Sequence, residues 1–406
     1  MTLLRRRGLA PLLAAQIVSS LGSQMTFLAL PWFVLVTTGS PTKMGIVLAA
    51  ELAPIALLGI PSGALVSRLG ARRTMLVGDA ARVPLMASLP LLHAAGLLSF
   101  PLLLGIVFAI GCFLAPYFSS QRVILPELVG DDERLVAQAN AILDGALRAT
   151  ALVGPAAAGL LISAFDAPNV LYVDAATFLF AFITLALFVP NRPPTPATDE
   201  SRGVLAGARF VLRDRLLGSL VLTALFLNMF GQMFVLSLPV LAYSEYGGSS
   251  RLAGLFFGAY GAGAVVGSLI AIRIMPRFDP VRLAAWALIA VSLPIWFLAL
   301  DLPAVAVLAV LAVTAIAGPL INAPLIGMIT TRTPEALRPK VMTAVMTFAM
   351  LAGPIGMLIA GFLLESWGPR HVFLLVAGGQ MLASIPFVSV ALRRREDAPE
   401  VATSPQ

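Results

Sequence analysis

Long, continuously apolar runs separated by short polar connections recur along the whole chain. In the first half they lie at about residues 10–36, 44–66, 74–93, 100–121, 135–164 and 170–189. Each run is close to the roughly 20 apolar residues that a helix needs to cross a bilayer. A membrane β-barrel would instead alternate apolar and polar positions over about ten residues. The pattern therefore predicts an all-α membrane protein with roughly twelve transmembrane helices.

The composition agrees with this prediction and excludes an ordinary soluble protein. Hydrophobic residues make up 59% of the 406 residues, charged residues 12%, and the mean hydropathy is +0.94. Soluble domains are about half apolar and a quarter charged. The connections between the apolar runs leave no room for a separate soluble domain.

The second half of the chain repeats landmarks of the first. The matching positions are Leu30-Pro31 and Leu238-Pro239, Met44-Gly45 and Ala253-Gly254, Pro126-Glu127 and Pro334-Glu335, and Gly159 and Gly361. Their offsets are 208, 209, 208 and 202 residues. Nearly constant offsets predict two pseudo-symmetric six-helix bundles, as in transporters whose halves are related by an axis along the membrane normal. We expect bundles at 1–190 and 216–395, a cytoplasmic linker at 191–215 and a disordered cytoplasmic tail at 396–406.

The positive charge is distributed unevenly over the predicted topology. Of the 27 Lys and Arg residues, 23 fall on one face or at helix ends near it, with Arg82 counted among these helix ends. Three fall on the other face, and Arg148 lies within a helix. Because cytoplasmic loops are enriched in Lys and Arg, we expect both termini in the cytoplasm and the protein in the plasma (inner) membrane. The pI near 10.3 then reports orientation in the membrane rather than nucleic-acid binding.

The connection between the second and third helices resembles the loop signature of the major facilitator superfamily. The matching positions are Gly63, Leu65, Arg68, Gly70, Arg72 and Arg73. Ser67 stands where that family usually has Asp, so the charge relay associated with the Asp does not carry over. The resemblance implies a conformational loop or gate here, and we expect Asp79 and Arg82 in the next helix to brace it.

A second resemblance is narrower. Gly154, Pro155 and Gly159 are similar to the helix-five signature of antiporters in this superfamily. Together with Thr38-Gly39-Ser40, Gly78-Asp79 with Arg82, and the segments 125–129, 139–141 and 174–178, they resemble the branch that contains macrolide-efflux proteins and enterobactin exporters. This likeness implies export of a drug, macrolide or siderophore-like solute driven by proton influx. Helix four lacks the embedded Arg of many drug–proton antiporters, and Arg148 on helix five is a hypothetical substitute.

Charged side chains inside membrane helices are costly, at roughly 2.5 to 3.5 kcal/mol each, so each needs a reason. The proton-coupling candidates are Glu51, Asp144, Arg148 and Asp174. Glu51 either binds the coupled proton or is neutralised by a hydrogen-bond partner. Asp144 and Arg148 form either a structural i,i+4 pair or a gate. Asp174 is either a solvated or capping charge near the outer end of helix six or a proton carrier.

Uncharged polar residues inside the runs predict a central cavity. The substrate-cavity candidates are Gln16, Ser20, Gln24, Asn228, Gln232 and Asn322. The alternative for these residues is that they join helices by hydrogen bonds.

Enzymatic signatures are missing from the sequence. It has no Gly-x-x-x-x-Gly-Lys-Ser/Thr loop for ATP, no nucleophile elbow beside a His-bearing framework, and only His93, His371 and Cys112 as His or Cys metal ligands. We therefore expect a non-enzymatic, monomeric secondary transporter with no metal or cofactor, exporting a lipophilic or amphipathic small molecule in exchange for protons. The alternatives are a metabolite importer or uniporter on the same fold, and a transport-inactive membrane receptor or partner.

Overall fold

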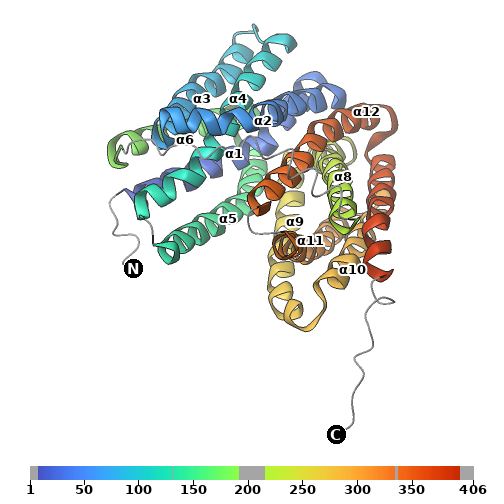
Figure 1. Cartoon of the computed structure of the whole chain (residues 1–406). Helices are drawn as coiled ribbons and strands as arrows, with labels where there is room; N and C mark the ends of the chain where they lie inside the picture. Colours follow the sequence, from blue (N-terminus) through green and yellow to red (C-terminus); the bar gives the residue numbers. More distant parts are fainter. Residues whose placement is uncertain (1–7, 131, 192–214, 334–336, 394–406) are drawn as a thin grey trace, which may run out of the picture.

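A computed structural model describes residues 8–130, 132–191, 215–333 and 337–393 of the chain. Within these ranges the chain is helical and contains no β-strand (Figure 1). The helices of the first half are α1 (Leu9–Thr38), α2 (Pro41–Leu69), α3 (Ala71–Ala94), α4 (Phe100–Val129), α5 (Glu133–Phe165) and α6 (Ala167–Phe188). Those of the second half are α8 (Arg215–Glu245), α9 (Ser250–Ile274), α10 (Pro280–Ser292), the 3-10 segment Pro294–Ala299, α11 (Ala304–Arg332) and α12 (Arg338–Arg393).

The described helices include eleven segments long and apolar enough to cross a membrane. The last of them, at Ala352–Ser389, contains two passes, because α12 turns back at Gly368, whose φ of 74° is a conformation that glycine adopts without strain. Counting both arms of α12, twelve passes are present in the described part of the chain. The predicted all-α membrane fold is confirmed.

Helices α1–α6 form one half of the molecule and α8–α12 the other (Figure 1). We call the end where α1 begins and where Gly70 and Gly130 join helices the termini face. The opposite face contains the turns at Gly39, Asp166, Gly248 and Gly368. The predicted linker and tail fall almost wholly on residues 192–214 and 394–406, outside the described residues.

The connections on the termini face are tighter than the sequence indicated. The fourth apolar run ends at about residue 121 in the sequence, but α4 continues through Val129 and ends at Gly130 with φ 89°. Gly70 alone separates α2 from α3, with φ 83°. Each glycine adopts a positive φ without strain because it has no Cβ to clash there.

The buried apolar side chains form three groups. One shared core on the opposite face joins residues of both halves, including Phe33, Met233 and Met357. A second core, around Leu12, Met75 and Leu128, contains only residues of the first half. A third core contains only residues of the second half; its members include Leu220, Leu288 and Phe387. The halves therefore pack together at one end and separately at the other.

Candidate functional site

The first seam between the halves is the crossing of α5 and α9. A Cβ atom placed on Gly159 would lie 2.7 Å from the Cα of Gly254, and one on Gly254 would lie 2.9 Å from the carbonyl oxygen of Pro155. Further along, Gly258 faces Ala156 and Gly261 meets Leu152. Small residues allow membrane helices to approach at backbone distance. Pro155 and Gly159 of the helix-five motif thus lie directly at the interface between the halves, whereas Gly154 packs against Gln24 of α1 within the first half.

The second seam is the crossing of α2 and α12. A Cβ on Gly361 would lie 3.1 Å from the Cα of Gly45, and the Thr42 hydroxyl donates to the Gly361 carbonyl at 3.3 Å. The two seams use equivalent positions, since Gly45 repeats as Gly254 and Gly159 repeats as Gly361. The internal repeat of the sequence therefore marks the two places where the halves touch most closely.

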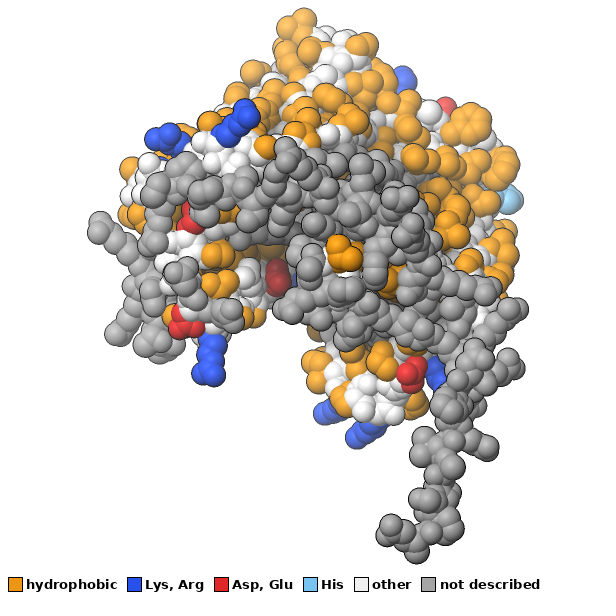
Figure 2. All heavy atoms as spheres, viewed as in Figure 1, with side chains coloured by type: hydrophobic (Ala, Val, Ile, Leu, Met, Phe, Trp, Pro, Cys, Tyr) orange, Lys and Arg blue, Asp and Glu red, His pale blue; other side chains and the backbone are white. Residues whose placement is uncertain are grey.

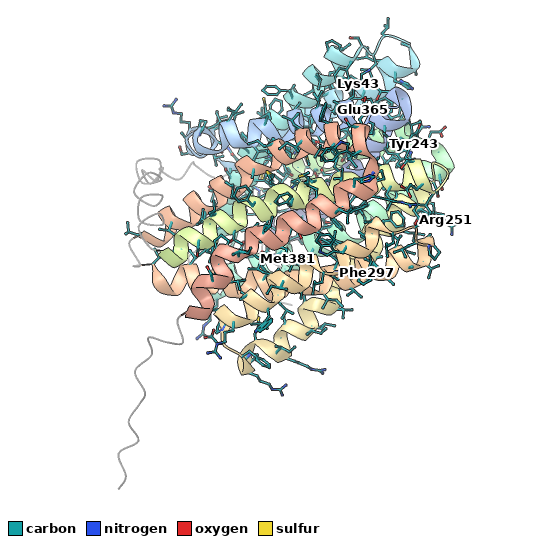
Figure 3. The ribbon with its side chains drawn as sticks, turned by 90° about the vertical axis from the view of Figure 1, so that its right-hand side faces the viewer. Lys43, Tyr243, Arg251, Phe297, Glu365 and Met381 are labelled. Carbon is teal, nitrogen blue, oxygen red and sulfur yellow. The ribbon has the colours of Figure 1, made fainter. Side chains whose placement is uncertain are left out.

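A carboxylate closes the outer end of the second seam. Glu365 of α12 accepts hydrogen bonds from the Ser40 hydroxyl at 2.6 Å and the Thr42 backbone N–H at 3.0 Å. These donors lie at the N-terminus of α2, where the helix dipole favours a negative charge. Figure 3 shows Lys43 and Glu365, from different halves, together at one end of the molecule.

The halves diverge toward the termini face. The surface is hollowed between the first turns of α5 and the turn between α9 and α10 (Figure 2). Asp144 and Arg148 of α5 are both exposed on this side. Among the described residues, no ion pair joins Asp144 to Arg148. In this conformation the two side chains therefore do not form the structural i,i+4 pair that was one of the two predictions.

Four of the predicted cavity residues lie at contacts between helices of the same half, on helices α1 and α8, which pack against the seam helices α5 and α12. The hydroxyl groups of Ser20 and Thr150 are 2.8 Å apart, and Gln24 packs against Gly154. Asn228 and Gln232 of α8 lie within 3.7 Å of a Cβ placed on Gly353 of α12. All four side chains are partly exposed, so they are available to a solute that enters between the halves.

The other two cavity candidates are placed differently. Gln16 is only 2% exposed, and its carbonyl oxygen accepts a hydrogen bond from the Gln121 amide, which joins α1 to α4. The prediction that Gln16 lines the cavity is therefore wrong for this conformation. Asn322 is exposed on α11.

Asp174 is buried, with 1% of its surface exposed. Its carboxylate accepts hydrogen bonds from Thr26 of α1 at 2.6 Å and from Thr177 at 3.1 Å. Gly22 of α1 makes room for it, because a Cβ there would meet the Asp174 and Thr177 side chains. The interpretation of Asp174 as a solvated or capping charge is wrong, because α1 packs over the carboxylate and excludes water.

Glu51 lies on α2, half-buried and within electrostatic range of Asp174. Within the described part of the chain, no side chain donates a hydrogen bond to its carboxyl group. A carboxyl group at this depth without a donor costs free energy when it is charged. The pair of acidic groups therefore lies inside the first half, next to the seams.

Arg82 was counted among the charges at helix ends, and this was wrong. It lies in the middle of α3, 2% exposed, and donates to Asp79 at 2.6 Å. Its guanidinium lies 4.2 Å from the ring centres of both Tyr117 and Phe178, a cation–π contact on each. The prediction that Asp79 and Arg82 brace the glycine loop is also wrong, because both are directed into the bundle.

Arg72, and not Arg82, anchors the glycine loop between α2 and α3. Arg72 donates hydrogen bonds to the carbonyl oxygens of Leu185 at 3.2 Å and Ala186 at 2.7 Å, in the last turn of α6. A cation at a helix C-terminus complements the helix dipole. Arg68 and Arg73 are exposed on the termini face, and nothing lies within 4 Å of a Cβ placed on Gly63.

No group of three or more His, Cys, Asp and Glu side chains that could hold a metal ion is present among the described residues. The acidic groups of the first half have hydroxyl, guanidinium or aromatic neighbours instead. Their chemistry is limited to binding a proton or pairing with a cation.

Known proteins share both the sequence pattern and the fold. Residues 2–405 match the family described as transmembrane secretion effector. The multidrug efflux pump Tap of Mycolicibacterium fortuitum is 27% identical over 98% of this chain and 99% of its own length. The enterobactin exporter EntS of Escherichia coli is 30% identical over 43% of each chain. The inward-facing, occupied crystal structure of a bacterial Spinster homologue matches 97% of this chain and 98% of its own, with a TM-score of 0.76 at 14% identity.

Proposed function

Because this chain belongs to the transmembrane secretion effector family of major facilitator transporters, we propose that it exports a lipophilic or amphipathic small molecule in exchange for protons by alternating access. We place it in the plasma (inner) membrane with both termini in the cytoplasm, working as a monomer without a cofactor. The likeness to a multidrug efflux pump over nearly the whole chain supports export. The excess of Lys and Arg on the termini face supports the orientation.

The observation that carries the proposal is the one-sided contact between the halves. Two glycine crossings and the Glu365 hydrogen bonds close the opposite face, while each half has its own core at the termini face. Alternating access requires two bodies that rock around a central site. In this proposal the described conformation is the end state that is open toward the cytoplasm.

The solute binds between the halves from the cytoplasmic side in this scheme. Ser20 and Gln24 contribute from the first half, Asn228 and Gln232 from the second. These side chains offer few hydrogen bonds and no full charge, which suits amphipathic molecules of varied structure. Rocking then breaks the two seams and opens the opposite face.

Protons drive the return to the inward-open state. Glu51 and Asp174 bind protons from outside when the opposite face is open, and release them when the termini face is open. Asp144 and Arg148 lie in the open space between the halves, where they act as a gate. The proton gradient supplies the energy.

The test is transport by purified protein in liposomes with an imposed pH gradient and the lipophilic cation ethidium as the probe. We expect the gradient to drive ethidium accumulation in the wild type and not in Glu51→Gln, with the protein still folded. Asp166→Asn is the matched control, because it removes an exposed carboxylate at a position with φ 68° that Asn tolerates. Gradient-driven accumulation in Glu51→Gln equal to the wild type would exclude Glu51 as a carrier.

Transport measurements in cells and in liposomes also separate export from the two alternative functions. A metabolite importer would carry its solute in the direction of the protons, so a protonophore would lower accumulation inside cells instead of raising it. A receptor or other inactive partner would move no solute under any pH gradient. Either result overturns proton-coupled export.

A further inference from the structure

One buried ionisable pair, Asp79 and Arg82 of α3, has no role in the scheme above. Asp79 is fully buried, at 0% exposure. Its Oδ1 accepts the hydrogen bond of Arg82, but its Oδ2 has no hydrogen-bond partner in the described structure. A buried carboxylate oxygen without a donor costs free energy, whereas a protonated, neutral carboxyl group costs much less. Asp79 is thus placed where gaining a proton relieves an unsatisfied charge.

Arg82 does not depend on Asp79 alone. Its guanidinium lies between the Tyr117 ring of α4 and the Phe178 ring of α6, each 4.2 Å away. It also donates to the Gly78 carbonyl oxygen at 3.2 Å. Cation–π contacts are strongest where the cation and the ring are shielded from water. When Asp79 becomes neutral, Arg82 therefore keeps two rings and a carbonyl as partners, and the bundle is not left with a bare charge.

The three carboxyl groups of the first half lie at graded depths. At a rise of about 1.5 Å per residue, Asp79 lies roughly 12 Å above the start of α3 on the termini face. On the same basis Asp174 lies about 21 Å above the end of α6, and Glu51 about 27 Å above the end of α2. Arg82 is within electrostatic range of Asp174, and Asp174 of Glu51. Of the three carboxyl groups, Asp79 lies nearest the termini face.

We propose that Asp79 binds and releases a proton in each transport cycle, as the station through which protons held deeper in the first half leave toward the termini face. This inference rests on the proposed proton-coupled export. The ionisable groups next to Asp79 are Arg82 on its own helix and Tyr117 of α4. Asp174 of α6 is in range of Arg82, and Glu51 of α2 is in range of Asp174. Since α1 contributes only uncharged side chains there, such as Ser19 and Thr26, Arg82 is the single cation in this set that opposes protonation of Asp79.

The test counts protons directly, by titrating the purified protein in detergent between about pH 5 and pH 9. We expect Asp79→Asn to bind about one proton fewer than the wild type over this range. Asp166→Asn, which removes an exposed carboxylate, is the control, and we expect it to bind the same number of protons as the wild type. An unchanged proton count in Asp79→Asn overturns the inference.

A second variant protects the test against misfolding. Asp79→Asn with Arg82→Gln removes both charges together, so no unpaired charge remains buried. We expect the double variant to fold, to show the same loss of a bound proton, and to lose pH-gradient-driven ethidium accumulation in liposomes. Accumulation equal to the wild type in this variant contradicts a station at Asp79. If the wild type itself shows no gradient-driven accumulation, the proposed function fails, while the titration still reports on Asp79.

Discussion

The two halves of the molecule share their architecture but differ in the groups they bury. Each half contributes one helix to each glycine crossing, at positions that repeat along the sequence. The first half buries Asp79, Arg82 and Asp174. In the described part of the second half, the buried polar side chains are all uncharged, such as Ser237, Thr314 and Gln380.

This difference separates two tasks that the fold performs together. Both halves contribute equally to the contact that closes one face, because small residues and backbone contacts form both crossings. Handling of charge is confined to the first half, because buried ionisable groups are tolerated only with partners. Under the proposed function, the second half is then the uncharged partner against which the first half rocks. The following substitutions test this division, beginning with the largest expected effect.

Asp174→Asn is expected to abolish proton-driven transport. The Asn side-chain oxygen can still accept the Thr26 hydrogen bond, so the helix contact between α1 and α6 survives while the proton site is lost. Asp301→Asn removes a carboxylate from the surface of the second half, where it pairs with Arg370 at 2.8 Å, and we expect it to leave coupling intact. The measurement is ethidium accumulation in liposomes under a pH gradient. Loss of coupling in Asp301→Asn but not in Asp174→Asn would reverse the assignment of the halves.

Arg82→Met is expected to lower the free energy of unfolding by about 3 to 5 kcal/mol at a pH that keeps Asp79 ionised, because the variant leaves the carboxylate buried and unpaired. Where Asp79 binds a proton, the loss is smaller. Thermal unfolding in detergent measures the effect. Arg251→Met, at an exposed position near the opposite face, is the control. A melting temperature for Arg82→Met equal to that of the control would show that the contacts of Arg82 with Asp79, Tyr117 and Phe178 contribute nothing to stability.

Gly254→Ala and Gly45→Ala are expected to have similar, smaller effects, since the two crossings are equivalent. A methyl group at Gly254 would lie 2.8 Å from the Cα of Gly159, and overpacking of this kind costs about 1 to 3 kcal/mol. Gly231→Ala is the control, because nothing lies within 4 Å of its Cβ position. Melting temperatures in detergent report the result. A large effect at one crossing and none at the other would break the symmetry of the seams.

Glu365→Gln is expected to have the smallest effect, below about 1 kcal/mol, because the carboxylate is exposed to solvent. Its hydrogen bonds to α2 weaken, and the difference from the wild type shrinks at high salt. Unfolding measured at two salt concentrations tests this expectation. A salt-independent loss of several kcal/mol would instead place this contact among the main supports of the closed face.

The positions of the seams left a signal in the sequence, although we did not predict them, whereas the burial of the charges was harder to detect. Hydropathy gave the helices, and the internal repeat marked Gly45, Gly159, Gly254 and Gly361, because close packing selects glycine locally. The burial of Asp174 depends on Thr26, which is 148 residues away in the sequence. A signal was available for this contact, since Thr26 and Gly22 lie one turn apart on α1 and form a polar notch.

The sequence also did not predict the contacts of the Arg82 guanidinium with Asp79, Tyr117 and Phe178. Tyr117 and Phe178 come from α4 and α6. Nothing in the sequence around them distinguishes these two aromatic residues from those that face lipid. Whether a charge in a helix faces loop, lipid or core depends on helix rotation, which apolar runs with little periodicity do not encode. Glu365 was missed for a related reason, since its partners are backbone and hydroxyl donors of the other half.

The central claim is that solute and protons move in opposite directions through one rocking site. The most direct test imposes an ethidium gradient on liposomes that contain the wild-type protein, without any pH gradient, and records pH inside them with a trapped dye. We predict proton movement opposite to the ethidium flux, which a protonophore dissipates and which Asp174→Asn lacks. Ethidium flux through the wild-type protein with no accompanying proton movement would contradict the account.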